Sequence, residues 1–283
     1  MTGKLIDGRA VAAAIYKTIK QEMIVLKQNH NIIPTLAVVV AGDDLASHRY
    51  VNMIEGKCRE IGVSSQIHRL PSSCSQEELI ELITSMNQDD QIHGVLLQLP
   101  LPALIDEKEV NSQVKAEKDV DGFHATNVGN LFLGDNTIYP CTPKGIMRLI
   151  KSTGIEIKGK NAVVIGRSNI VGKPAAIMLL NENATVTICH SRTKNLKEHV
   201  IKADILVVAV GKTDLITSDM IKEGAVVIDA GTNIVSGKIT GDVEFDKARE
   251  IASFITPVPG GVGPMTIAML IENTVEIAKK KCK

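Results

Sequence analysis

Residues 163–174 read Val163-Val164-Ile165-Gly166-Arg167-Ser168-Asn169-Ile170-Val171-Gly172-Lys173-Pro174. An apolar run stops at Gly166, a polar loop follows, and Gly172 opens a segment of good helix formers. This order predicts a strand, a loop and a helix whose N-terminus offers free N–H groups to a phosphate. The two glycines stand six residues apart, so the spacing differs from the usual G-x-G-x-x-G pattern. The context of the stretch, rather than that fingerprint, therefore predicts a dinucleotide-binding turn.

Further apolar runs follow this turn along the second half of the chain. We predict strands over 184–189, 205–210, 225–229 and 253–256, with helices over 174–180 and 196–202. The runs are continuous rather than alternating, which is typical of strands covered on both faces in a parallel sheet. Their carboxyl ends, where open α/β sheets bind ligands, carry Gly166, His190-Ser191-Arg192, Gly211-Lys212 and Asp229.

The first half of the chain also alternates helices and strands. We predict helices over 8–27, 47–61 and 75–86, and strands over 35–41, 63–70 and 93–99. Ser75 and Glu78 form a capping box at the start of the third helix. The polar, irregular segment 106–134 predicts a hinge, and residues 265–281 predict a long helix that packs back onto the first half. We therefore expect an α/β protein of two domains, residues 1–138 completed by 265–283, and a Rossmann-like domain of residues 139–264.

Composition excludes several classes of protein. The 283 residues carry 32 acidic and 32 basic side chains and no Trp, so neither a basic surplus nor stacking platforms indicate nucleic-acid binding. No apolar run approaches the length of a membrane span, and no signal peptide opens the chain. The five cysteines are scattered without a C-x-x-C pair, so we expect no metal site and no disulfide framework. These features predict a cytoplasmic enzyme with reduced thiols.

Six motifs together carry a resemblance to a known family. From about Ile6 to Thr274, the chain resembles the methylenetetrahydrofolate dehydrogenase/cyclohydrolase family, the bacterial FolD enzymes. The motifs are Tyr50-Val51 followed by Cys58 and Gly62-Val63; Gly94-Val95-Leu96-Leu97-Gln98-Leu99-Pro100-Leu101-Pro102; Lys118-Asp119-Val120-Asp121-Gly122-Phe123; Pro140-Cys141-Thr142-Pro143; Gly166-Arg167-Ser168-x-x-Val171-Gly172; and Pro257-Val258-Pro259-Gly260-Gly261-Val262-Gly263-Pro264-Met265-Thr266.

The resemblance implies a fold and a reaction. It implies an N-terminal folate domain, an NADP domain, a folate cleft between the two domains, and a homodimer. It implies hydride transfer from 5,10-methylenetetrahydrofolate to a nicotinamide, followed by hydrolysis of the methenyl product to 10-formyltetrahydrofolate. Such an enzyme serves one-carbon metabolism and purine biosynthesis, and its partners are tetrahydrofolate derivatives rather than nucleic acid or a membrane.

The resemblance also implies roles for particular residues. The expected catalytic residues are Tyr50, Gln98 and Asp121, which also bind folate together with Pro259, Gly260 and Gly261. A buried amide such as Gln98 needs hydrogen-bond partners, and a carboxylate such as Asp121 suits the N–H donors of a pterin. The expected cofactor-binding residues are Gly166, Arg167, Ser168, Val171, Gly172, Ser191, Arg192, Gly211 and Thr232.

The residues at the end of the second Rossmann strand indicate the cofactor. An acidic residue usually binds the ribose 2′-hydroxyl of NAD at that place. Here the strand ends in His190-Ser191-Arg192 without a carboxylate, and Arg167 in the glycine turn can converge on the same spot. Two guanidinium groups and a hydroxyl fit a 2′-phosphate, so the sequence predicts NADP.

Position 54 departs from the family pattern Tyr-Val-x-x-Lys, because Ile54 stands where the lysine is expected. Isoleucine has no proton to give or take, so we expect the cyclohydrolase step to be weak and a separate cyclohydrolase to act downstream, while hydride transfer continues. The alternative is a fully bifunctional enzyme in which Lys57 or water substitutes.

Two functions of other kinds stay open on the sequence. One is a folate- and nucleotide-binding sensor without catalysis, motivated by Ile54 alone. The other is a dehydrogenase of unrelated small substrates, because a Rossmann scaffold does not fix the substrate.

Overall fold

The computed structural model describes residues 2–282, which form two compact units. The six-stranded unit comprises the chain up to Ala13 together with Pro140–Met269. The three-stranded unit comprises Ala14–Tyr139 and the chain from Leu270 onward. Residues 2–13 therefore belong with the Rossmann-like part, although the sequence predicts them in the N-terminal domain. The reason is a short strand, β1 (Lys4–Leu5), that pairs in parallel with β11 (Phe254–Ile255).

The six-stranded sheet has the order β1-β11-β8-β7-β5-β6, and all neighbours run in parallel. Its central strands are β5 (Asn161–Ile165), β7 (Ile205–Val208) and β8 (Val226–Asp229), and β6 (Thr185–Cys189) forms one edge. The chain passes from β5 to β6 on one side and then crosses to β7 on the other. The carboxyl end of β5 is therefore a topological switch point, where open α/β sheets bind their ligands.

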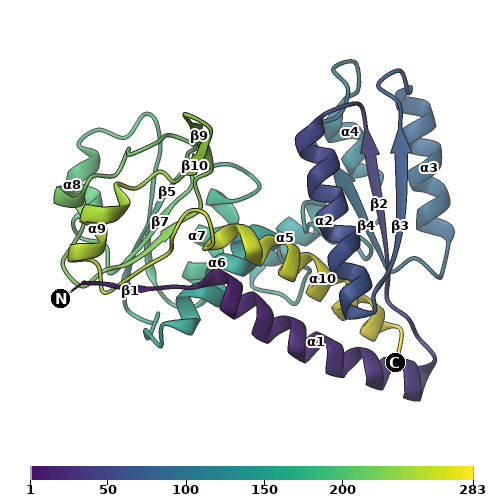
Figure 1. The fold of residues 1–283 in the computed structure, drawn as a ribbon, viewed down its shortest axis with the longest axis horizontal. Coiled ribbons are helices and arrows are strands. Elements are labelled where there is room, and N and C mark those ends of the chain that lie inside the picture. The colour runs from purple at the N-terminus through teal and green to yellow at the C-terminus, as the bar shows by residue number, and fades with distance from the viewer. Residues whose placement is uncertain (1, 283) are drawn as a thin grey trace. The chain divides into compact units, whose positions relative to one another are not determined.

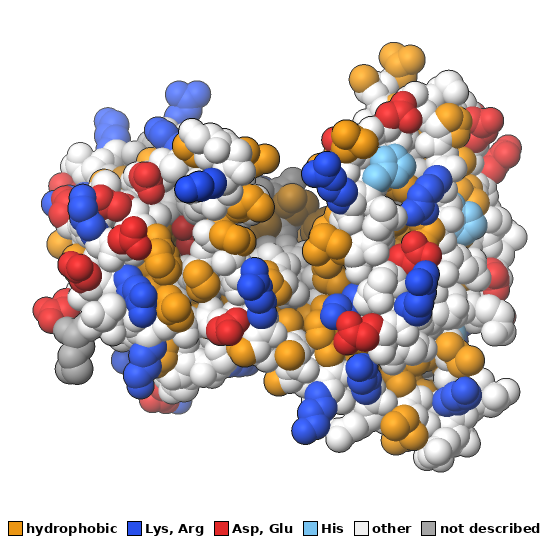
Figure 2. Space-filling model, in the orientation of Figure 1, with side chains coloured by type: hydrophobic (Ala, Val, Ile, Leu, Met, Phe, Trp, Pro, Cys, Tyr) orange, Lys and Arg blue, Asp and Glu red, His pale blue; other side chains and the backbone are white. Residues whose placement is uncertain are grey.

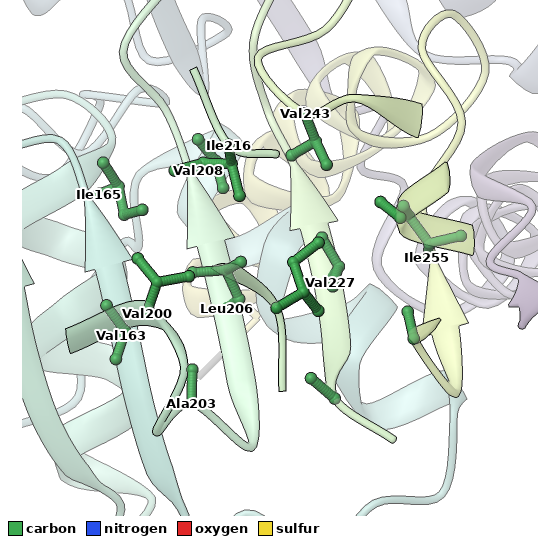
Figure 3. Close-up of a cluster of buried hydrophobic side chains, with 14 of the residues drawn as sticks. Val163, Ile165, Val200, Ala203, Leu206, Val208, Ile216, Val227, Val243 and Ile255 are labelled. Carbon is green, nitrogen blue, oxygen red and sulfur yellow. The ribbon is translucent and has the colours of Figure 1, made fainter. Parts of the chain in front are cut away.

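Helices and a hairpin complete this unit (Figure 1). They are α6 (Cys141–Ser152), α7 (Gly172–Asn181), α8 (Leu196–Val200), a 3₁₀ turn (Ser218–Met220), the hairpin β9 (Asn233–Val235) and β10 (Lys238–Thr240), and α9 (Phe245–Ile251). Helix α7 packs on β5 and β6, and α9 packs on β11. Figure 3 shows one hydrophobic cluster of the unit, in which Val163, Leu206 and Val227 from three strands meet Val200 of α8.

The three-stranded sheet is parallel, in the order β3 (Ser64–Leu70), β2 (Thr35–Ala41), β4 (Gly94–Gln98). Helix α2 (Leu45–Ile61) packs on β2 and β3. Helix α3 (Gln76–Gln88) contributes its apolar face to a core shared with Ala37 and Val39 of β2. Every residue of β2 is buried, as its continuous apolar pattern predicts. The long helices α1 (Gly8–His30) and α10 (Val262–Lys280) contribute residues to both units.

Local signals in the sequence explain where several helices start. The predicted capping box is present, because Ser75 Oγ accepts the Glu78 N–H at 3.1 Å and Glu78 Oε2 accepts the Ser75 N–H at 2.8 Å. The prediction of an irregular hinge over 106–134 was wrong in part. That segment forms α4 (Glu107–Ser112), capped by Asp106, and α5 (Ala125–Leu133), capped by His124. Side-chain caps stabilise such short helices, and their six and nine residues are too few to display a clear hydrophobic period.

Burial differs between the strands. The prediction that the Rossmann strands are covered on both faces fails for β6, where three of five residues are exposed because the strand lies at the sheet edge. On the face shown in Figure 2, acidic and basic side chains are interspersed with small apolar patches. Within residues 2–282, no helix is both long enough and apolar enough to cross a membrane.

Candidate active site in two units

The glycine turn after β5 is closely packed. Gly166 has a φ of +122°, and a Cβ built there would lie 2.3 Å from the Ala209 carbonyl oxygen of the neighbouring strand end. A Cβ on Gly172 would lie 2.3 Å from the Gly166 carbonyl oxygen. Neither contact leaves room for a side chain, so both positions require glycine. The turn therefore holds its backbone against the start of α7, as a dinucleotide site demands.

Ser168 shapes the same turn from within. Its Oγ accepts the N–H groups of Val171 at 3.1 Å and Gly172 at 3.2 Å, at the N-terminus of α7. Ser168 therefore holds the turn together, and because its O–H group can still donate, its predicted contact with the cofactor stays a prediction. The N–H groups of Val171, Gly172 and Lys173 have their acceptors on Ser168, so the prediction that they are free to bind a phosphate is wrong for these three. The dipole of α7 still favours an anion at this end of the helix.

Three polar side chains stand exposed around the predicted 2′-phosphate position. Arg167 lies in the turn after β5, and Ser191 and Arg192 lie in the turn after the neighbouring strand β6. The Arg192 N–H bonds to His190 Nδ1 at 3.1 Å, and Thr193 Oγ1 accepts the His190 N–H at 2.9 Å. These local bonds fix the second turn without using the guanidinium groups. Two cations on adjacent strand ends can therefore converge on one anionic group.

Gly211 and Thr232 follow β7 and β8. Gly211 has a φ of +66°, and its N–H bonds to the buried Asp242 carboxylate at 3.0 Å. Thr232 is exposed one residue after Gly231, whose N–H bonds to Asp229 Oδ1 at 2.9 Å. The structure therefore brings both residues to the predicted edge of the sheet, but the Gly211 N–H already has an acceptor within the protein.

In the three-stranded unit, Tyr50 and Gln98 belong to neighbouring elements. Helix α2 begins after the central strand β2, and Gln98 ends the adjacent strand β4. Gln98 Nε2 donates to the Leu99 carbonyl oxygen at 2.7 Å, and Ser47 Oγ, one turn before Tyr50, lies 3.3 Å from the same oxygen. The first turns of α2 are thus tied to the strand end that carries Gln98. Tyr50 and Gln98 are both half-buried.

Asp121 lies on a loop that runs beside β4. Val95 of β4 bridges in parallel to Asp119, and its N–H bonds to the Lys118 carbonyl oxygen at 2.8 Å. Asp119 is buried and accepts N–H groups from Gly122 at 3.0 Å, His124 at 2.7 Å and Asn127 Nδ2 at 2.9 Å. Burial raises the pKa of Asp119, and these hydrogen bonds oppose the rise. Asp119 therefore fixes the turn that presents Asp121.

Ile54 and Lys57 occupy different surroundings on α2. Ile54 is fully buried and lies on the buried face of the helix with Val51 and Cys58. Lys57 Nζ lies 2.6 Å from Glu60 Oε2 and 4.9 Å from the centre of the Tyr16 ring of α1. The hydrogen bond from Lys57 lowers the pKa of Glu60, and burial raises the pKa of Tyr16. Lys57 is therefore engaged with Glu60 and Tyr16, seven residues beyond Tyr50.

The Pro259-Gly260-Gly261 stretch belongs to the six-stranded unit, between β11 and α10. Gly260 has a φ of +113°, and a Cβ on Gly261 would lie 2.7 Å from the Pro257 carbonyl oxygen. The carbonyl oxygen of Gly261 packs on Gly8, where a Cβ would collide with it at 1.8 Å. These contacts within the unit account for the two glycines without a ligand.

One group of buried polar residues was not predicted from the sequence. Asp229 and Asp242 are 3% and 0% exposed. Asp242 accepts hydrogen bonds from the turn after β7, and Asp229 accepts one from the turn after β8. Asp229 stands at a predicted strand end, but no signal marked Asp242, which follows the hairpin β9–β10 thirteen residues later. Burial raises the pKa of Asp229 to about 6, while N–H groups of Asp242, Gly231 and Val243 oppose the rise.

The fold and the glycine turn define the class of the protein. It is an α/β enzyme with a Rossmann-like dinucleotide unit and a second α/β unit that carries Tyr50, Gln98 and Asp121. Sequence comparison specifies the family. The catalytic domain described as tetrahydrofolate dehydrogenase/cyclohydrolase matches residues 6–121, and the NAD(P)-binding domain of the same description matches residues 140–282. The chain belongs to the tetrahydrofolate dehydrogenase/cyclohydrolase family.

Individual relatives cover the whole chain. The bifunctional protein FolD of Moorella thermoacetica is 56% identical, over 99% of this chain and 100% of the relative. The crystal structure of FolD from Campylobacter jejuni is 48% identical with a TM-score of 0.96, over 98% of this chain and 99% of the other. The FolD structure of Trypanosoma brucei, complexed with NADP cofactor and an inhibitor, is 39% identical with a TM-score of 0.96, over 100% and 99%.

These comparisons correct one expectation. Ile54 was expected to weaken the cyclohydrolase step, but the relatives that match the whole chain are named bifunctional. The expected loss, and the separate downstream cyclohydrolase that it would require, are therefore not borne out. The same relatives speak against a non-catalytic sensor and against a dehydrogenase of unrelated substrates.

Proposed function

We propose that this protein oxidises 5,10-methylenetetrahydrofolate with NADP and hydrolyses the methenyl product to 10-formyltetrahydrofolate. The observation that carries the proposal is the closely packed Gly166–Gly172 turn with Arg167 and Arg192 beside it, in a chain that belongs to this family throughout. Purified protein supplied with methylenetetrahydrofolate and NADP should produce NADPH, and supplied with methenyltetrahydrofolate alone it should consume that substrate faster than a buffer blank. No turnover in either assay would refute the proposal.

The residues present fit NADP. We place the pyrophosphate at the N-terminus of α7, beside the closely packed Gly166–Gly172 turn, where the helix dipole favours an anion. The end of β6 offers Ser191 and Arg192 and no carboxylate, which suits a 2′-phosphate and would leave a 2′-hydroxyl without its usual acceptor. Bound NADP would supply the acceptor for the hydride that leaves the methylene carbon.

The chain's own residues align the folate and exclude water during the first step. We assign Asp121 to the N–H donors of the pterin, and Tyr50 and Gln98 to the reacting carbon. Pro259, Gly260 and Gly261 remain predicted folate-binding residues. Hydride leaves a carbon that the neighbouring nitrogen already activates, so this step depends on alignment more than on an acid or a base. A fully buried Ile54 is compatible with that requirement.

The hydrolytic step needs a positioned water molecule. Gln98 Nε2 donates to the Leu99 carbonyl oxygen, so Gln98 Oε1 is the atom that it can offer as an acceptor to a water O–H. The Tyr50 hydroxyl can hold the same water as donor or acceptor. The methenyl carbon is cationic before water attacks, so hydrogen-bonded water can react without a lysine at position 54. This assignment favours water over Lys57 as the substitute.

We expect Lys57→Met to retain hydrolysis of methenyltetrahydrofolate within about threefold of wild type, because acid–base participation would instead contribute about 10²–10⁴-fold. The reason is that Lys57 Nζ is held by Glu60 and Tyr16. The measurement is the loss of methenyl absorbance against a blank, with Lys20→Met, the other lysine near Glu60, as the control. A hundredfold drop confined to Lys57→Met would instead assign the proton transfer to Lys57.

We expect the wild-type protein to prefer NADP to NAD in kcat/KM, and Arg167→Ala combined with Arg192→Ala to reduce that preference by about 10–100-fold. Because both guanidinium groups are exposed, we expect them together to contribute about 1.5–3 kcal/mol to binding of the 2′-phosphate, the size of one hydrogen bond to a charged group. Lys202→Ala removes an exposed cation of the same unit and serves as the control. A wild-type preference for NAD, or a double variant that keeps its preference for NADP, would contradict the assignment.

We also propose a homodimer that forms through the hairpin β9–β10. Three apolar side chains of this hairpin are exposed: Ile234 by 78%, Val235 by 45% and Ile239 by 47%. Ile234 and Ile239 are cross-strand partners on one face of the hairpin, and Val235 lies on the opposite face. An exposed apolar pair such as Ile234 and Ile239 is typical of an association surface. Sedimentation should show a dimer at micromolar concentration, and Ile234→Asp should shift it to a monomer, whereas Ile24→Asp on α1, which is also exposed, should not. A wild-type monomer at that concentration would contradict the proposal.

The cytoplasm is the proposed location. All five cysteines are free thiols, as suits a reducing compartment.

A further inference from the structure

The loop after β7 is held by one buried carboxylate. Asp242 Oδ2 accepts the N–H groups of Val210 at 2.8 Å and Gly211 at 3.0 Å, and Oδ1 accepts the Lys212 N–H at 2.8 Å. Asn233 Nδ2 donates to the same Oδ1 at 2.9 Å. Three consecutive amides of the loop therefore point inward to a single side chain that has no exposed surface.

A second carboxylate fixes the first. Asp229 Oδ2 accepts the N–H groups of Asp242 at 2.8 Å and Val243 at 2.9 Å, and its Oδ1 accepts that of Gly231 at 2.9 Å. Two glycines let the carboxylates approach the backbone so closely: a Cβ on Gly241 would lie 2.0 Å from Asp229 Oδ2, and one on Gly231 would lie 2.3 Å from Asp242 Cγ. The position of the Asp242 carboxylate is thus set by the end of β8.

The loop that Asp242 holds contacts the glycine turn. The Ala209 N–H bonds to the Ile165 carbonyl oxygen at 2.8 Å, and the Ala209 carbonyl oxygen occupies the space beside Gly166. A Cβ on Gly166 would also lie 3.6 Å from Val210 Cγ1. A shift of residues 210–212 would therefore displace the atoms of Ala209 and Val210 against which Gly166 packs.

Only a carboxylate satisfies all four donors. The four hydrogen bonds come from neutral N–H groups, and a carboxylate offers about four lone-pair sites. An asparagine of the same shape would turn an NH₂ group toward two of these donors and leave them without an acceptor. Burying a charge without a cation is unfavourable by itself, so the demand of the loop for an acceptor is the physical reason for an aspartate here.

We propose that Asp242 is a positioning residue for the nicotinamide cofactor: it engages the amides of residues 210–212, so that this loop presents its carbonyl oxygens and outer surface, rather than its N–H groups, to NADP. The proposal rests on the NADP dependence proposed above. It assigns to Asp229 the role of fixing Asp242, and it places neither carboxylate in contact with the cofactor.

The first test uses wild-type protein and does not depend on a variant. Hydrogen–deuterium exchange should show the amides of Val210, Gly211 and Lys212 already protected in the protein without NADPH, because their acceptor is Asp242. Amides that exchange freely and become protected only when NADPH is added would overturn the proposal, since the cofactor would then be their acceptor.

The second test compares Asp242→Asn with Asp246→Asn, an exposed aspartate of α9 in the same unit. Calorimetric titration with NADPH should give a dissociation constant at least about 10-fold higher for Asp242→Asn, the size expected when buried donors lose their acceptor. Asp246→Asn should bind as wild type does. Exchange at residues 210–212 should accelerate in Asp242→Asn alone.

Hydrolysis of methenyltetrahydrofolate separates this role from general unfolding, because that step uses no NADP. Asp242→Asn should lower kcat/KM for NADP far more than it lowers hydrolysis. An NADPH affinity within twofold of wild type, in a variant whose loop amides exchange faster, would overturn the proposal. Wild-type protein that binds no NADPH would instead refute the proposed function and leave the exchange test of the loop intact.

Discussion

Gly172→Ala should weaken NADP binding by about 100-fold. The new Cβ would lie 2.3 Å from the Gly166 carbonyl oxygen, 2.5 Å from the Gly166 carbonyl carbon and 2.9 Å from the Arg167 nitrogen, all of them backbone atoms. Backbone on a strand end cannot rotate away as a side chain can, so the turn must open. Overpacking of this kind costs about 1–3 kcal/mol, and the upper part of that range corresponds to about 100-fold in affinity.

The matched control is Gly56→Ala on α2. Gly56 is exposed within a helix, and a Cβ there would have no atom within 4 Å. This substitution should raise the free energy of unfolding by about 1 kcal/mol, because alanine is the better helix former. Calorimetry with NADP measures the first effect and denaturant unfolding the second. Gly172→Ala that binds NADP within threefold of wild type would show that the turn does not need its close contact.

Asp121→Asn should raise the KM for both folate substrates by about 10–100-fold. A hydrogen bond to a charged acceptor contributes about 1.5–3 kcal/mol, and the variant keeps the shape of the side chain while removing its charge. The turn itself should persist, since Asp119 rather than Asp121 accepts the N–H groups of Gly122 and His124. Both reactions should suffer, because both bind the same pterin.

Steady-state kinetics with methylene- and methenyltetrahydrofolate measure this effect, and titration with NADPH shows whether the six-stranded unit is intact. Glu117→Gln, an exposed carboxylate of the same loop, provides the control and should keep the wild-type KM. If Asp121→Asn changed the KM for NADP and not that for folate, the assignment of Asp121 to the pterin would be wrong.

Much of the fold could be predicted because the buried strands have a distinctive composition. The strand predicted over 35–41 coincides with β2, and those over 205–210 and 225–229 contain β7 and β8. Strands buried on both faces need continuous apolar residues, which a sequence displays directly. The hairpin β9–β10 and β1 escaped prediction, because strands of two or three residues with exposed side chains carry no such pattern.

The candidate site was predictable where glycine and motif spacing carry information. Gly166 and Gly172 meet backbone atoms, so no other residue fits, and the sequence reveals that constraint. The surroundings of Ile54 were not predictable in the same way. Position 54 lies one helical turn after Tyr50, yet Ile54 is fully buried while Tyr50 is half-buried, because the packing of α2 on its sheet decides which side chains are covered.

The sequence by itself determined the alternation of strands and helices, the glycine turn and the family of the chain. These depend on dihedral preferences, apolar periodicity and short motifs, which act over a few neighbouring residues. Only the tertiary structure decided that Lys4 pairs with Phe254, that the Lys57 ammonium group lies over the Tyr16 ring, and that Asp242 receives three amides from a loop about thirty residues earlier. Hydrogen bonds of this range form only when the folded chain brings distant donors and acceptors together and removes the water that would otherwise satisfy them.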